Sequence, residues 1–135
     1  PRHDDGRDHL MGGVKLDGAG TQKMKTIEEA LHAMATIHAM VERAAVEAKN
    51  HKPIGVIPQQ IKRIATPLQG QLKGQFGLIA DQVAAFILST TRGGGGEQAK
   101  IRGMREGVAQ IKTALELAAT KVKEQHAVPI EVSPD

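Results

Sequence analysis

The sequence predicts an all-α fold, namely an antiparallel bundle of three or four helices with a flexible N-terminal tail. Aromatic residues make up only 1% of the 135 residues, whereas β-strands are enriched in aromatic side chains. Apolar residues recur at alternating spacings of three and four in three long segments, which is the repeat of an amphipathic helix. The length corresponds to a single domain with a modest core.

Residues 1–25 are rich in Gly and Asp and contain few side chains that could be buried. Because burial cannot offset the entropy lost on ordering such a segment, we expect a flexible tail here. The tail holds several potential metal ligands, which are His3, Asp4, Asp5, Asp8 and His9. Their spacing matches no known ligand pattern, so we expect no metal site.

The first helix is expected over residues 26–49. Thr26 is followed three residues later by Glu29, which is the pattern of a capping box at a helix start. The apolar seam of this helix consists of Ile27, Ala30, Met34, Ile37, Val41, Ala44 and Ala48. The connection that follows, NHKPIGVIP, ends the helix because Pro53 and Gly55 both disfavour helical conformation.

The second helical region is expected to be divided at Pro67. A proline lacks the amide hydrogen and clashes with the carbonyl four residues earlier, so it ends or kinks a helix. We therefore expect a short helix over residues 58–65 and a long one over residues 67–90, with a kinked helix as the alternative. The residues expected to face inward are Leu68, Leu72, Phe76, Ile79, Val83 and Phe86.

The four consecutive glycines from Gly93 to Gly96 are expected to form a flexible turn before the last helix. That helix is predicted over residues 97–126. Its apolar seam consists of Ile101, Met104, Val108, Ile111, Leu115, Ala118 and Val122. The predicted bundle thus covers residues 26–127, and residues 128–135, which contain two prolines, are predicted to be an extended tail.

Three long helices with short connections pack most simply in an up-down-up arrangement. Further apolar residues widen the stripes beyond one seam, and these are Leu31, Met40, Leu78, Ile87, Leu88 and Leu117. A widened stripe indicates a second contact surface, so the sequence predicts self-association as a dimer or a larger oligomer.

Three glycines, Gly70, Gly74 and Gly77, lie in the predicted long helix at spacings of four and three, which places them on one face. Each costs a helix interior about 1 kcal/mol relative to Ala, so a packing reason is expected. The favoured interpretation is a crossing with another helix of the bundle, and the alternative is a docking surface for a partner helix. Polar neighbours complete this candidate interaction face, and these are Gln71, Lys73 and Gln75.

The segment GQLKGQFG resembles the motif of histidine-containing phosphotransfer domains, in which a phosphorylated His is followed by any residue, Leu, Lys and Gly. Leu72, Lys73 and Gly74 match this motif, but Gly70 stands at the His position. The resemblance covers residues 70–74 only. It implies a degenerate docking relative of these domains that takes up no phosphoryl group, because Gly70 offers no nucleophile.

The formal net charge of +3, from 18 basic and 15 acidic residues, is mild and interspersed along the chain. Such a balance argues against a dedicated nucleic-acid-binding protein. A candidate basic face on the last helix consists of Arg102, Arg105 and Lys112. Because Glu106 and Glu116 interrupt this face and no aromatic side chain accompanies it, a nucleic-acid-associated bundle is the weaker alternative.

The sequence favours a protein–protein interaction module with a regulatory, adaptor or assembly role, acting on a protein partner or on itself. We expect neither enzymatic activity nor a cofactor, because each acidic residue falls near a basic one on a polar helix face. The chain lacks Cys, and no apolar run approaches the roughly 20 residues of a membrane span. The absence of Cys leaves the redox compartment undetermined, and a cytoplasmic location is only the default expectation.

Overall fold

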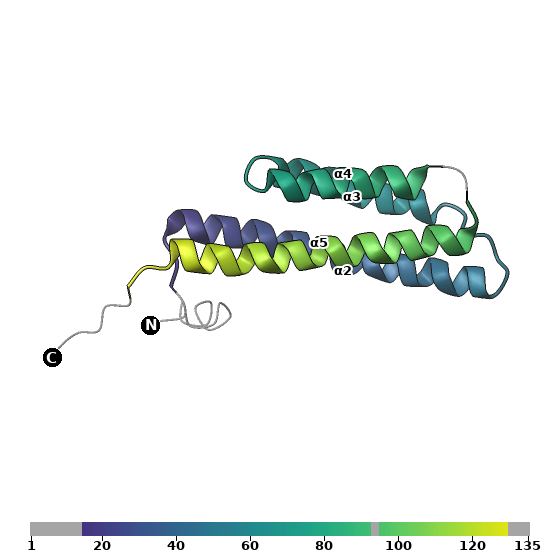
Figure 1. The fold of residues 1–135 in the computed structure, drawn as a ribbon, viewed down its shortest axis with the longest axis horizontal. Coiled ribbons are helices and arrows are strands. Elements are labelled where there is room, and N and C mark those ends of the chain that lie inside the picture. The colour runs from purple at the N-terminus through teal and green to yellow at the C-terminus, as the bar shows by residue number, and fades with distance from the viewer. Residues whose placement is uncertain (1–14, 93–94, 130–135) are drawn as a thin grey trace.

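A computed structural model describes residues 15–92 and 95–129, and these residues form the all-α helical bundle that the sequence predicts. The four helices in this part of the chain are α2 (Gly18–Lys49), α3 (Ile57–Lys73), α4 (Gly77–Thr91) and α5 (Glu97–His126). Each helix contacts two others, so that the four form a closed ring in chain order. Neighbours in this ring run antiparallel (Figure 1).

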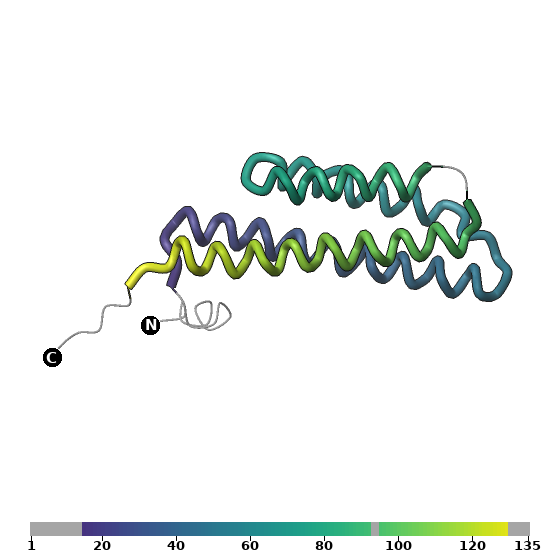
Figure 2. Tube along the Cα trace, in the orientation of Figure 1, coloured from purple at the N-terminus to yellow at the C-terminus, as the bar shows by residue number. Residues whose placement is uncertain are grey.

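The four helices differ in length, so the turn between the two shorter helices lies beside α5 instead of at its end. At 1.5 Å per residue, α2 with its 32 residues is about 48 Å long, and α5 is nearly equal to it. The α3–α4 hairpin is only about half as long. Figure 2 shows that the α2–α5 pair extends past the hairpin turn, on the side of the N-terminus of α2 and the C-terminus of α5.

The core is aliphatic and lies where the apolar seams of the helices meet. The predicted seam of α2 is buried from Ile27 to Ala44, and that of α5 is buried from Ile101 to Leu115 and again at Val122. The period of three and four residues therefore predicts the inward faces of both long helices correctly.

The helix predicted over residues 26–49, α2, begins earlier than predicted, at Gly18 rather than at Thr26. Its N-cap is Asp17, whose Oδ1 accepts a hydrogen bond of 2.7 Å from the amide of Gly20. Thr26 lies inside the helix, where its hydroxyl donates to the carbonyl of Gln22. An Asp cap thus replaces the predicted Thr cap.

Residues 15–25 therefore belong to the fold, which corrects the predicted boundary of the tail. The reason is tertiary packing, which the composition of the segment does not reveal. Leu16 forms an antiparallel bridge with Ala127, and Met24 is 3% exposed. Contacts of this kind offset the low helix propensity of the glycines in the segment. The remaining residues of the predicted N-terminal tail lie outside the described residues.

The predicted break at Pro67 is wrong, because α3 continues through this residue to Lys73. Pro67 is exposed, so its ring lies on the solvent side of the helix. Ala65 and Leu68, on either side of it, remain on the buried face in one helical register. Core packing on both sides of the proline thus outweighs the local cost of one missing hydrogen bond.

The break falls instead between Gly74 and Gly77, where the chain reverses. Gly74 is the C-cap of α3, and α4 begins at Gly77. Between them, the amide of Phe76 donates to the carbonyl of Leu72 at 2.7 Å, and Phe76 leaves helical backbone angles. The residues predicted to form one helix over 67–90 therefore belong to two antiparallel helices, α3 and α4.

Candidate interaction surface

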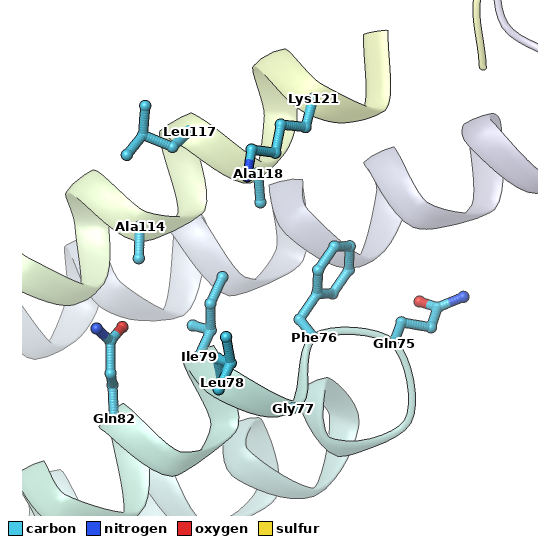
Figure 3. A pocket seen from close by; sticks show the side chains of 10 residues that line it. All are labelled: Gln75, Phe76, Gly77, Leu78, Ile79, Gln82, Ala114, Leu117, Ala118 and Lys121. Atoms are coloured by element: carbon cyan, nitrogen blue, oxygen red, sulfur yellow. The ribbon is translucent and has the colours of Figure 1, made fainter. Parts of the chain in front are cut away.

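A groove lies where the α3–α4 turn meets the C-terminal half of α5 (Figure 3). Its volume is about 500 Å³. The groove is lined by Gln75, Phe76, Gly77, Leu78, Ile79, Gln82, Ala114, Leu117, Ala118 and Lys121. Phe76 and Ile79 point toward α5 from the hairpin, opposite Ala114 and Ala118, so the groove has an apolar interior.

Two leucines stand exposed beside this groove, one on each helix. Leu78, in the first turn of α4, is 83% exposed, and Leu117 of α5 is 60% exposed. Full burial of a leucine contributes about 1.5 to 3 kcal/mol, so each of these side chains forgoes most of that stabilisation. Exposed apolar side chains beside a concave surface make this groove a candidate contact site.

The groove carries almost no charge. Gln75 and Gln82 contribute side-chain amides, and Lys121 is the only charged residue among those that line it. Covering such a surface removes few charges from water, so the desolvation cost of a contact is small.

A second groove, of about 280 Å³, continues along the same two helices and shares Gln82 with the first. Its other lining residues are Ala85, Phe86, Ser89, Gly103, Glu106, Gly107, Gln110 and Ile111. Glu106 is the one charged residue among them. The lining residues of both grooves together are called the α4–α5 face from here on.

The structure divides the candidate interaction face that the sequence predicts. Gln75 and Gly77 line the first groove. The remaining members, Gly70, Gln71, Lys73 and Gly74, are exposed outside it. A Cβ added at any of the three glycines would meet no atom of the described chain within 4 Å apart from its chain neighbours and the adjacent backbone of its own helix. The favoured interpretation of an internal helix crossing at these glycines is therefore wrong.

Among the described glycines, close approaches occur at Gly20 and Gly107, for which the sequence predicts no packing role. A Cβ at Gly20 would overlap the side chain of His126, and a Cβ at Gly107 would overlap the ring of Phe86. Both glycines lie inside helices, where their neighbours in the sequence give no sign of a crossing.

The residues that resemble a phosphotransfer motif lie at the end of α3. Leu72 is fully buried, Lys73 is exposed in the last turn, and Gly74 caps the helix. The motif-like segment thus ends a helix, whereas the sequence predicts it within the interior of a long one.

One member of the candidate basic face on α5 is engaged in an ion pair between helices. Arg105 binds Glu42 of α2 through two hydrogen bonds, Nε to Oε2 at 2.9 Å and Nη2 to Oε1 at 2.7 Å. The hydrogen bond from Arg105 lowers the pKa of the Glu42 carboxyl, and the same contact raises the pKa of Arg105. Arg102 and Lys112 are exposed. The structure therefore leaves two of the three predicted cations outside an α2–α5 ion pair.

A second polar cluster joins the N-terminus of α2 to the C-terminus of α5. Nδ1 of His126 lies 3.1 Å from Oδ1 of Asp17, and Nε2 of His126 lies 3.3 Å from Nζ of Lys23. A proton on Nδ1 lets His126 donate to Asp17 and accept from Lys23. The amide of Gly20 is the main cause that lowers the pKa of Asp17, and His126 lowers it further. The cluster links the N-terminus of α2 to the C-terminus of α5. None of its residues lines either groove.

Within residues 15–92 and 95–129, no three His, Asp or Glu side chains converge in a way that could hold a metal ion. The five candidate ligands of the N-terminal segment lie outside these ranges. None of the helices described is both long enough and apolar enough to cross a membrane.

Comparison of the chain with protein-family models, with curated proteins and with solved structures finds no match. Leu78 and Leu117 are both among the residues that widen the apolar stripes in the sequence, but the sequence alone does not place them side by side. Leu78 lies near Leu117 because the chain reverses at Phe76. The prediction of one continuous helix over residues 67–90 excludes this turn.

Proposed function

We propose that the protein is a non-enzymatic interaction module that assembles with a second copy of itself through the α4–α5 face. The observation that carries this proposal is the exposure of Leu78 and Leu117 beside one apolar groove. Apolar surface that leaves water on association contributes about 25 cal/mol per Å², from which the costs of binding are subtracted.

The chemistry of the α4–α5 face favours binding over catalysis. Among the residues that line the two grooves, Glu106 is the only carboxylate and none is a histidine. Acid–base catalysis requires titratable groups that converge on one reacting atom. A docking surface requires apolar area with few charges, and this description fits the lining.

The two charges of the face favour a second copy as the occupant. Lys121 and Glu106 both belong to α5 and lie about 22 Å apart along its axis at 1.5 Å per residue. A two-fold axis that relates two antiparallel α5 helices brings Lys121 of each copy near Glu106 of the other. Because the other lining residues are uncharged, this pairing opposes no like charges within the face.

Light scattering over a series of protein concentrations tests the proposal, and a monomer–dimer equilibrium is expected. Leu78→Ser and Leu117→Ser should each weaken dimerisation by about tenfold or more, because a two-fold interface contains each leucine twice. The melting temperature at low concentration should stay the same, since both side chains are exposed. Leu88→Ser is the matched control, because Leu88 is 59% exposed on α4 but lines neither groove.

Charge reversal tests the antiparallel arrangement itself. Lys121→Glu and Glu106→Lys should each weaken the dimer, because each opposes like charges across the interface. The double variant restores opposite charges and should dimerise like the parent protein. A parent protein that is monomeric at every concentration contradicts the proposal, and so does a double variant as weak as the single ones.

A further inference from the structure

The acidic residues are distributed unevenly along the sequence. From Ala48 to Ala80 the sequence contains neither Asp nor Glu. The basic residues of the same stretch are Lys49, Lys52, Lys62, Arg63 and Lys73. The mild net charge of the whole chain thus conceals a basic segment that is centred on α3.

Three of these cations lie on the solvent side of α3. Lys62, Arg63 and Lys73 are all exposed, whereas Ile61 and Leu72, next to them in the sequence, are fully buried. None of the three cations forms an ion pair with a described residue. Their charges are therefore available to a ligand that approaches α3 from solvent.

A glycine occupies the centre of this surface. Gly70 is seven residues after Arg63 and three before Lys73, which places all three on one face of the helix. Apart from its chain neighbours and the adjacent backbone of α3, a Cβ at Gly70 would meet no atom of the described chain within 4 Å, so the space above it is open. An extended ligand can therefore lie close to the helix between the cations.

We propose that this surface, which consists of Lys62, Arg63, Gly70 and Lys73 and is called the α3 basic face, binds the phosphate backbone of double-stranded nucleic acid. Lys62 and Lys73 lie about 16 Å apart along the helix axis at 1.5 Å per residue. A duplex carries one negative charge per about 1.7 Å of its axis, so a stretch of duplex of this length carries several phosphates. Binding through the backbone alone is independent of base sequence.

The composition of the face favours a duplex over a single strand. Binding of a single strand relies on aromatic side chains that stack on the bases, and α3 contains none. Gln59 and Gln71 are exposed on the same helix and can donate hydrogen bonds to phosphate oxygens. Contacts to a duplex backbone come from cations and from hydrogen-bond donors, and α3 presents both.

Phospholipid headgroups present the same phosphate chemistry but fit this face less well. Stable attachment to a membrane needs apolar side chains that insert, or a larger cluster of cations. The apolar residues of α3, such as Ile61, Ala65, Leu68 and Leu72, are buried in the bundle. The α3 basic face therefore has charge without an apolar anchor.

The inference goes beyond self-association and does not depend on it. No residue of α3 lines either groove of the α4–α5 face, so a dimer formed through that face leaves α3 accessible. Failure of the dimer and failure of nucleic-acid binding are thus separate experimental results.

Fluorescence anisotropy with a short labelled duplex of mixed sequence measures the binding. Three phosphate contacts predict a slope of about −2.7 for log K against log salt concentration, which is about a 40-fold loss of affinity between 50 and 200 mM salt. Lys62→Gln, Arg63→Gln and Lys73→Gln should each make the slope less steep by about 0.9. Arg102→Gln and Lys112→Gln, which remove exposed cations of α5, are the matched controls and should leave the slope unchanged.

Substitution of Gly70 tests the face without removing a cation. Gly70→Glu places a carboxylate among the three cations and should weaken duplex binding by about tenfold or more relative to Gly70→Gln, its uncharged match. Both variants should fold at least as well as the parent protein, because the site is open and both side chains favour a helix more than Gly does.

Several results overturn the proposal. The first is the absence of duplex binding at about 50 mM salt, where such contacts are strong. The second is a loss of binding caused by the α5 variants as large as that caused by the α3 variants. The third is tighter binding to a single strand, or to vesicles of anionic phospholipid, than to the duplex.

Discussion

The ring of Phe86 lies directly against the backbone of Gly107, at a site where an added Cβ would come within 2.6 Å of the ring atom Cδ1. Phe86 is 4% exposed, so the ring has little freedom to move away. Gly103, one turn earlier in α5, has open space at the same position. Two glycines of one helix thus have opposite structural roles.

Gly107→Ala is expected to destabilise the protein, although alanine has the higher helix propensity. The ring of Phe86 would have to shift, and overpacking typically costs about 1 to 3 kcal/mol, against a gain of about 1 kcal/mol in propensity. Gly103→Ala should gain up to about 1 kcal/mol, because nothing opposes its methyl group. Urea unfolding measures both changes, and equal stabilities of the two variants would contradict the close approach.

His51 ends α2 in the left-handed region, with φ of 59°. The amide of Lys52 donates to the carbonyl of Glu47 at 2.8 Å, and the amide of His51 donates to the carbonyl of Ala48 at 3.0 Å. These two hydrogen bonds form a Schellman motif. His51→Gly should raise the free energy of unfolding by about 1 kcal/mol, because a side chain is strained at this position. His51→Ala retains a Cβ and should give no such gain. Thermal denaturation distinguishes them, and an equal gain in both variants would exclude backbone strain as the cause.

Thr90 is fully buried, and its hydroxyl has no hydrogen-bond partner in the described part of the chain. An unsatisfied buried hydroxyl costs about 1 to 3 kcal/mol, so Thr90→Val, which keeps the shape, should raise the melting temperature. Thr91→Val is the control, because the Thr91 hydroxyl already donates to the carbonyl of Ile87 at 2.9 Å. Calorimetry that finds a lower melting temperature for Thr90→Val would show that the hydroxyl is satisfied.

The contact of Asp17 with Gly20 makes the stability of the bundle depend on pH. The amide of Gly20, and to a smaller extent His126, lowers the pKa of Asp17 in the folded state. Because the unfolded value is higher, near 3.9, the contribution of Asp17 is present above about pH 4 and is lost as the pH falls through the folded pKa. The difference in unfolding free energy between the parent protein and Asp17→Asn should therefore be largest near neutral pH and decrease in acid. A difference that is constant over this range would contradict the assignment.

The apolar periodicity predicts the buried faces better than it predicts the helix ends. Leu72 and Ile79 are both buried as expected, although they belong to different helices. The spacing continues through Phe76 because the reversal keeps the apolar residues on the side that faces the core. Periodicity alone cannot separate a helix interior from such a turn. The glycines on both sides of Phe76 are the local signal for the reversal.

The remaining differences from the sequence prediction have tertiary causes. Pro67 is tolerated inside α3 because Ala65 and Leu68 pack on the core on both sides of it. The groove beside Leu78 and Leu117 requires the correct position of the turn, which propensity does not supply. The basic character of α3, by contrast, is present in the sequence, and an average over the whole chain conceals it.

The bridge between Leu16 and Ala127 brings two distant points of the sequence together, so the order of the helices can be rearranged without moving any of them. Joining Lys15 to Val128 through a short linker, and opening the glycine connection before α5, gives a circular permutant with the order α5, α2, α3, α4. The contact between α2 and α5, the first and last of the described helices, becomes one between successive helices, while the less extensive contact between α4 and α5 becomes the distant one. Since folding accelerates as contacts become more local, the permuted chain should reach the same bundle faster than the natural order does.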